Sequence, residues 1–300
     1  MNLITLNKGN QSSAICKYLL DNYLKLASIE ELQAFLNKKY NANLTVDGEI
    51  GNQTYFYLYK ELCNPQSPNM IFNGYYAQKF PKKQIVLHHT AGWDNAEGVF
   101  QGWQVDQQWH VATAIAISDS GKLVRGFDED YWAHHIGMSN AFNTARNTES
   151  VAVEICNWGC LEERGGEYFT YINNFGKTGK PITLPKERVI ALDYKGYKFY
   201  EAYTDAEIAK VKIWILLMAM KYEIPLDYNH KDVFPKQGET SNRAIQGDAG
   251  IYSHNSFIDW KTDISPQPKM IEMLKEIAQI GKPTIVATTA EPKVKKEVKT

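Results

Sequence analysis

The sequence predicts an α/β domain preceded by a small all-α domain of three helices. Three observations support this division. Residues 1–63 carry apolar side chains at helical spacing, whereas from residue 79 onward short apolar runs rich in β-branched residues alternate with longer helical patterns. Residues 64–78, which begin with a run of Asn, Pro and Ser, are interpreted as a linker. We therefore expect the second domain to span residues 79–280.

Three helices are expected in the first domain. Ser12 and Ser13 precede a periodic stretch at residues 14–26. Ser28 is a suitable N-cap for a second helix, with Glu31 at the capping-box position. A turn containing glycine follows, and the third helix is expected at residues 54–62.

The second domain combines strands and helices. Strands are expected at residues 84–89, 111–118 and 151–155, and a turn at 119–121 leads to a further strand near 123–124. Thr204 and Glu207 form a capping box for a helix that runs to about Tyr222, and a similar helix occupies 269–280. Residues 281–300 have few large apolar side chains, which is typical of a disordered tail.

Charge and hydropathy exclude several classes of partner. The formal net charge is -1 and the pI is about 6.7, so we expect neither nucleic acid nor an anionic membrane surface as a partner. No apolar run reaches the roughly 18 residues that a membrane-spanning helix needs. The first residues lack a charged segment followed by an apolar one, so a signal peptide is not expected.

Two histidine-containing segments could carry metal chemistry. His88 and His89 end the strand predicted at 84–89, where alternation lets at most one of them face a given site. His254, Lys261 and Asp263 bring an imidazole, an ammonium and a carboxylate into ten residues of predicted loop. Two histidines and a carboxylate form a common catalytic zinc set. The alternatives are a hydrogen-bonded histidine in the strand and a solvated loop.

Glu154 is the third candidate. It lies inside the apolar strand predicted at 151–155, where an unpaired charge is costly. It is either half of a buried structural salt bridge or a general base beside a metal-bound water.

The first domain resembles the three-helix peptidoglycan-binding module that accompanies many wall hydrolases. The matching residues are Glu31-Leu32-Gln33, Leu36, residues 44–51 and Thr54, with Leu6-Asn7-Lys8-Gly9 upstream. The alternative is a helical docking domain.

Residues 79–280 resemble the zinc N-acetylmuramoyl-L-alanine amidases, a family that includes phage lysins and peptidoglycan-recognition proteins. The motifs occur in family order: Val86-Leu87-His88-His89-Thr90; Trp109-His110-Val111 with Asp119-Ser120-Gly121; Ala133-His134-His135-Ile136-Gly137; Glu149 to Glu154; and His254 with Lys261-Thr262-Asp263. The resemblance implies a central mixed β-sheet flanked by helices.

The resemblance also implies the site. One Zn2+ would be held by His88, His254 and Asp263. Glu154 and Lys261 would be catalytic, and the pocket would include His135 and Trp109. Two departures affect the rim of this pocket: Ile264-Ser265-Pro266 replaces the family's usual Pro-Gly-Pro, and residues 159–203 are longer than usual and could form an extra hairpin.

The implied function is zinc-dependent hydrolysis of the amide between N-acetylmuramic acid and L-alanine in bacterial peptidoglycan, as in an endolysin. Without a signal peptide, delivery to the wall would need a holin or an injection apparatus. Three alternatives stay open: a non-catalytic recognition protein, a zinc hydrolase of another amide, and a structural phage or injection-machine component with secondary hydrolysis.

Overall fold

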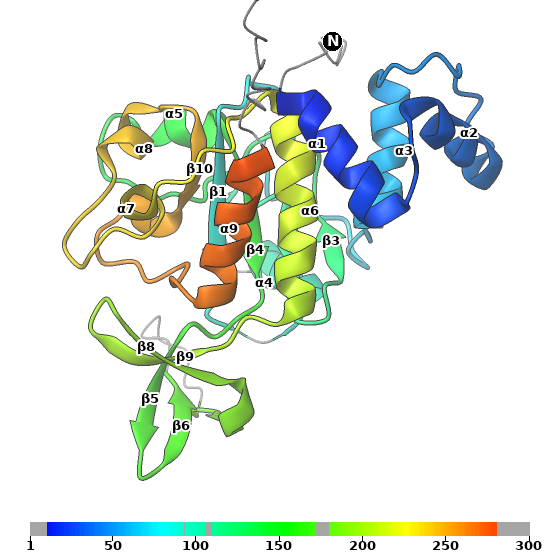
Figure 1. Cartoon of the computed structure of the whole chain (residues 1–300). Helices are drawn as coiled ribbons and strands as arrows, with labels where there is room; N and C mark the ends of the chain where they lie inside the picture. Colours follow the sequence, from blue (N-terminus) through cyan, green and yellow to red (C-terminus); the bar gives the residue numbers. More distant parts are fainter. Residues whose placement is uncertain (1–10, 93, 106–109, 172–179, 281–300) are drawn as a thin grey trace, which may run out of the picture.

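The computed structural model describes residues 11–92, 94–105, 110–171 and 180–280. It has three parts: a group of N-terminal helices, a layered α/β core, and a β-sheet arm that projects from one end of the core (Figure 1). Trp109 and the tail at 281–300 lie outside the described residues. No helix in the described part of the chain is both long enough and apolar enough to cross a bilayer.

The core contains a five-stranded sheet of order β10-β1-β4-β2-β3. Its members are β1 (Gln84–His89), β2 (Ile115–Ile117), β3 (Leu123–Arg125), β4 (Ser150–Ile155) and β10 (Gly250–Ser253). The first four strands in that order run parallel, and β3 is antiparallel to β2. The sheet is therefore mixed, as the sequence predicted. All six residues of β1 are buried, which explains its continuous apolar run.

One predicted strand is shorter than expected. Of residues 111–118, only Ile115–Ile117 form β2, while Val111 forms an isolated bridge with His134. His110 has a φ of 55°, a left-handed conformation that interrupts extended structure just before this run.

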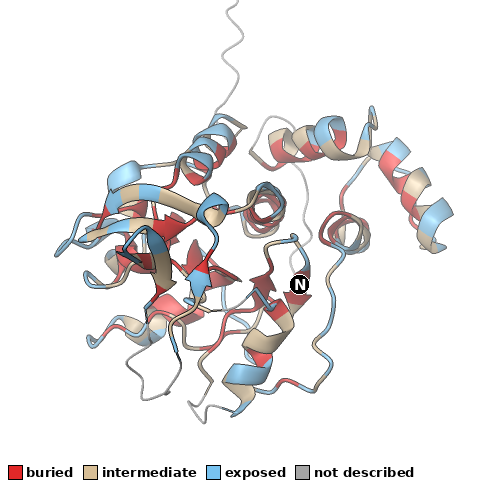
Figure 2. Cartoon of the chain, turned by 90° about the horizontal axis from the view of Figure 1, so that it is seen from below, coloured by how far each residue is buried: buried red, intermediate tan, exposed pale blue. Residues whose placement is uncertain are grey.

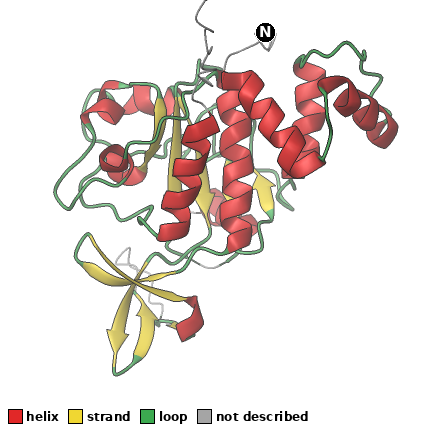
Figure 3. Ribbon diagram, in the orientation of Figure 1, coloured by secondary structure: helices red, strands yellow, loops and turns green. Residues whose placement is uncertain are grey.

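Two long helices cover one face of the sheet (Figures 1 and 3). They are α6 (Asp205–Tyr222) and α9 (Pro268–Ile280), which pack against each other. The predicted capping box of α6 is present, because the Glu207 amide donates to Thr204 Oγ1 at 3.1 Å and the Thr204 amide donates to Glu207 Oε2 at 2.7 Å. Shorter helices lie around the rest of the sheet: α4 (Ala96–Val105), α5 (Asn143–Thr148), α7 (His230–Val233) and α8 (Asn242–Gln246).

The N-terminal part contains α1 (Gln11–Leu19), which continues into the π-helical turn η1 (Leu20–Leu24), followed by α2 (Ile29–Tyr40) and α3 (Asn52–Cys63). Ser28 caps α2 as predicted, accepting from the Glu31 amide at 3.3 Å. Glu31 Oε2 accepts from the Ala27 amide, so only half of the expected capping box forms. Ser12 lies inside α1 and not before it.

The N-terminal helices pack directly on the α/β core. Helix α1 lies against α6 and α9, and α3 also contacts α6. The Tyr55 hydroxyl of α3 donates to the Leu217 carbonyl of α6 at 3.1 Å. Ile15 and Leu19 are completely buried in a hydrophobic cluster that continues into α6 and the sheet. Figure 2 shows buried residues concentrated on the strands and on the inward faces of the helices.

The arm is an antiparallel sheet of order β7-β6-β5-β9-β8. Its strands are β5 (Cys160–Arg164), β6 (Glu167–Thr170), β7 (Thr183–Leu184), β8 (Val189–Tyr194) and β9 (Tyr197–Glu201). The segment 159–203, which we expected to form an extra hairpin, thus builds a sheet of its own.

Candidate metal site and catalytic residues

Three predicted ligands converge at the C-terminal ends of β1 and β10 in the core sheet. His88 lies near the end of β1, and His254 follows β10, the parallel neighbour of β1, in the short helix η3 (His254–Ser256). The Asp263 carboxylate reaches the same point from the next loop. Its Oδ2 lies 2.9 Å from His254 Nδ1 and 3.3 Å from His88 Nδ1. One potential ligand atom from each residue lies within 4.8 Å of the others, and all three residues are buried.

The tautomer of His254 follows from its second ring nitrogen. His254 Nε2 lies 2.9 Å from the Ile136 carbonyl oxygen, which can only accept a hydrogen bond. Nε2 therefore carries a proton, which leaves Nδ1 as the ring nitrogen that faces Asp263 and is available to a metal.

A chain of three hydrogen bonds sets the tautomer of His88 in the same way. Ser150 Oγ donates to the Arg146 carbonyl at 2.5 Å, so it accepts from His135 Nε2 at 2.8 Å. His135 Nδ1 is then left unprotonated and accepts from His88 Nε2 at 3.0 Å. His88 Nδ1 consequently also presents a lone pair toward Asp263.

This arrangement fits a divalent cation. Two nitrogen lone pairs that face a carboxylate repel it unless a positive charge lies between them. Burial lowers the pKa of His88 to about 4 although the neighbouring Asp263 carboxylate acts in the opposite direction, so this imidazole is neutral at pH 7. Burial alone would raise the pKa of Asp263, but His254 and His88 outweigh it and hold that pKa well below its usual value. Neutral imidazoles and an ionised carboxylate are the states in which these groups bind metal.

His89 faces away from this cluster, as strand alternation predicts. Its Nδ1 lies 3.2 Å from the Tyr203 hydroxyl. Gly159, at the base of the arm, packs against the other side of the His89 ring. A Cβ atom at position 159 would lie only 2.4 Å from His89 Nε2, and the φ of Gly159 is 71°, so this position requires glycine. His89 therefore supports the packing of the arm on the core.

Glu154 lies beside the candidate metal site. It is paired in register with His88 across β1 and β4, and registered neighbours in a sheet share a face. Burial, with a further contribution from Asp263, raises the pKa of Glu154 well above its usual value, while Lys261 acts in the opposite direction. Among the described residues its carboxylate forms no ion pair, which removes the structural salt bridge as an explanation.

Lys261 and Trp260 form the outer rim of the site. Lys261 Nζ lies 4.8 Å from the centre of the Trp260 ring, and its charge contributes to lowering the pKa values of both Glu154 and His88. The indole of Trp260 is 68% exposed. The ammonium is therefore near enough to act on charge in the site, while its stem lies along an aromatic surface.

His135 has contacts that the sequence motifs did not predict. We expected it to line the substrate pocket, and in the structure its ring lies between His88 and Ser150. Asn147 Oδ1 fixes its backbone by accepting from the amides of His135 and Ile136. Ser150 and Asn147 were missed as site residues because nothing in their own segment shows that they meet His135.

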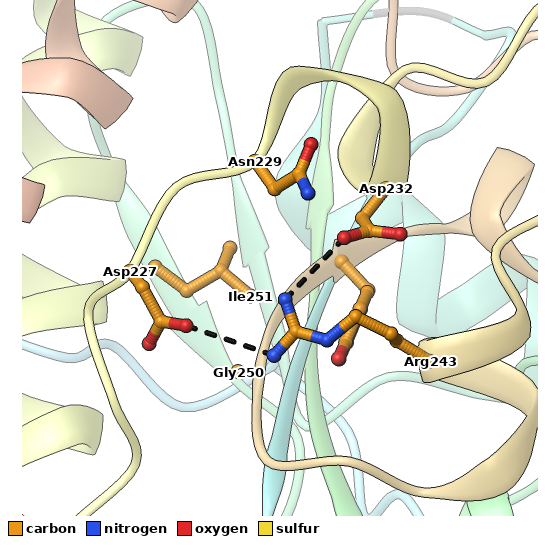
Figure 4. Close-up of a pocket in the computed structure, with 7 residues that line it drawn as sticks. Asp227, Asn229, Asp232, Arg243, Gly250 and Ile251 are labelled. Carbon is orange, nitrogen blue, oxygen red and sulfur yellow. Dashed lines mark hydrogen bonds and ion pairs between the residues drawn. The ribbon is translucent and has the colours of Figure 1, made fainter.

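A separate small pocket lies beside β10 (Figure 4). Arg243 occupies it, 3.4 Å from Asp232 Oδ2 and 3.6 Å from Asp227 Oδ2. None of the predicted site residues lines this pocket. This pocket is therefore not the candidate metal site. The candidate metal site lies beyond the C-terminal end of β10, where the donor atoms of His88, His254 and Asp263 converge.

Two imidazoles and one carboxylate at the end of a buried sheet make the donor set that zinc hydrolases use. Comparison with family models makes the class specific: residues 78–268 match the model described as N-acetylmuramoyl-L-alanine amidase. The chain belongs to this family.

Solved structures with detectable similarity include phage and bacterial proteins and an insect protein. PlyL is 14% identical, with 71% of this chain and 94% of that chain covered and a TM-score of 0.38. The amidase LysC from Clostridium intestinale URNW is 11% identical, with 71% and 97% covered and a TM-score of 0.40. Drosophila peptidoglycan recognition protein SA is 10% identical, with 71% and 91% covered and a TM-score of 0.37. No curated protein matches the chain.

Proposed function

We propose that this protein hydrolyses the amide between N-acetylmuramic acid and L-alanine in bacterial peptidoglycan, with one zinc ion held by His88, His254 and Asp263. Family membership supports the substrate class. The observation that carries the chemistry is the convergence of the three donor groups, with both histidine tautomers set by second hydrogen bonds.

When bound at this position, zinc supplies a Lewis acid and lowers the pKa of water to about 7. Glu154 accepts a proton from the attacking water and delivers it to the leaving amine of L-alanine. Burial raises the pKa of Glu154 well above its usual value, which makes its carboxylate a stronger proton acceptor. Lys261 stabilises the negative charge that develops on the carbonyl oxygen.

Two features distinguish this proposal from a recognition protein without activity. A recognition protein needs neither a proton acceptor nor a complete donor set, whereas this chain places Glu154 in register with His88 and completes the set. We also propose that the N-terminal helices belong to the wall-binding part of the protein, and that its place of action is the bacterial cell wall.

The decisive experiment is digestion of purified peptidoglycan with and without a chelator, followed by mass spectrometry of the fragments. We expect new L-alanine amino termini that disappear with the chelator and return with added zinc. Fragments cut elsewhere in the peptide would identify a different hydrolase, and bound zinc without released fragments would identify a recognition protein.

A further inference from the structure

We propose that Trp260, together with Tyr171 and Tyr197 of the arm, forms a surface that binds the glycan strand of peptidoglycan beside the candidate metal site. The inference rests on the proposed amidase function, because it assigns the sugar half of that substrate to one side of the site.

The first argument is that the arm holds the loop of Trp260 on both sides of the indole. Lys195, in the turn between β8 and β9, donates from Nζ to the Asp259 carbonyl at 2.7 Å. Cys160, at the start of β5, lies close to Thr262. The loop therefore contacts the arm on both sides of Trp260, and a loop held in this way loses little conformational freedom when a ligand covers the exposed indole.

The second argument is that aromatic rings continue from this loop onto the arm. Tyr197 lies close to Cys160, and its ring packs edge-on against Tyr171 with centroids 5.2 Å apart and an interplanar angle of 76°. Tyr171 is 43% exposed and Trp260 is 68% exposed. Large aromatic side chains exposed beside a functional site commonly mark a binding surface.

The chemistry of these rings fits a sugar. One face of a pyranose ring consists of C–H groups, which pack on the electron-rich face of an indole or phenol, while tyrosine hydroxyls can bond to the sugar's hydroxyl and N-acetyl groups. Stem peptides carry ionised groups, for which uncharged rings offer no partner. Since Trp260 precedes Asp263 by three residues, a strand bound here passes directly beside the amide to be cut.

The test measures the binding affinity for glycan fragments with a variant that does not hydrolyse them. Zinc-loaded Glu154→Gln protein would be titrated calorimetrically with peptidoglycan glycan fragments of increasing length, each carrying its stem peptides. We expect affinity to rise with strand length, and Trp260→Ala in the same background to weaken binding of the long fragments about tenfold and to flatten this dependence. Trp260→Phe should restore part of the loss.

Phe80→Ala is the matched control, because Phe80 is a 38% exposed aromatic residue that precedes β1 and lies outside both the N-terminal helices and the arm; it should bind as the parent does. An unchanged length dependence in Trp260→Ala would overturn the inference, as would an equal loss of affinity for a stem peptide that carries no sugar. Failure of the proposed function is a separate result: wild-type protein would then release no L-alanine termini, whatever the affinity for glycan.

Discussion

The hydrogen-bond chain from Ser150 through His135 to His88 is the feature at the residue scale that most affects the candidate metal site. The position of the proton on each side chain is set by its hydrogen bond to the next group in the chain. The last group is the Arg146 backbone carbonyl, which can only accept a hydrogen bond. Partners of metal-binding histidines commonly contribute 10- to 100-fold in metal affinity.

Ser150→Ala should therefore weaken zinc binding by about tenfold or more, because His135 loses the acceptor that fixes its tautomer. Competition with a fluorescent chelator measures this directly. Ser118→Ala is the control: Ser118 is also buried, but it bonds within the turn after β2. Equal zinc affinity in the Ser150 variant and the wild type would show that the chain does not act on His88.

Glu154→Gln should lower kcat by roughly 10²- to 10⁴-fold while zinc stays bound, because an amide keeps the shape of the side chain but cannot carry the proton. Release of L-alanine termini and metal content, measured on the same preparation, test both parts. Substantial hydrolysis by this variant would remove Glu154 from the proposed mechanism.

Several site residues could be predicted because they lie in short motifs. His88 ends an apolar strand and Glu154 interrupts one, so each is visible in its own segment. Ser150 could not be found in this way, since its partner His135 lies 15 residues earlier and only the fold brings the two together. The same reason explains why the position of His135 against His88 was not foreseen.

At the scale of elements, the start of α6 carries a titratable group. Burial raises the pKa of Glu207 to about 8, although its hydrogen bonds in the capping box act in the opposite direction. A carboxyl group whose pKa is higher in the folded than in the unfolded chain stabilises the fold at low pH, and that stability is lost as pH rises from about 4.5 to about 8.

Glu207→Gln should keep the cap and remove this pH dependence. We expect the variant and the wild type to be similarly stable near pH 4.5, and the variant to be more stable by up to about 5 kcal/mol at pH 8.5. Urea unfolding at several pH values tests this, with the exposed Asp205→Asn in the same turn as the control. A difference that does not grow with pH would contradict the prediction.

Elements with strong local patterns were predicted with nearly correct ends. Helix α6 has its capping box, and β1 and β4 each contain a run of three apolar residues. The arm was not predicted as a sheet, although Lys195 and Gly196, both with positive φ, form a turn typical of a hairpin between β8 and β9. The pairing of β5 with β9 joins residues about 40 positions apart, and no local signal specifies it.

At the scale of the whole molecule, the N-terminal helices and the amidase core share one hydrophobic interior. Hydrogen bonds cross the boundary as well as apolar packing. For example, Tyr59 of α3 donates to the buried Glu129 at 2.5 Å, and Gln11 of α1 bonds to the backbone at Ile224 and Leu226. We therefore propose that residues 1–63, although predicted as a separate domain, unfold together with the core.

Leu19→Ala should lower the free energy of unfolding of the whole protein by about 2–5 kcal/mol, the usual cost of truncating a fully buried leucine. Thermal unfolding should shift as one transition, whether followed by far-UV circular dichroism or by loss of zinc. Lys17→Ala, on the exposed side of α1, is the control. A second transition that leaves zinc binding intact would show that the helices unfold on their own.

The packing of α1 on α6 also limits how this protein can be re-engineered. Cutting the chain near residue 63 to exchange the N-terminal helices for another domain would expose the apolar side chains of α6 to water. Such a chimera would tend to aggregate before its specificity could be measured. A different domain would be better fused to an exposed loop far from α6.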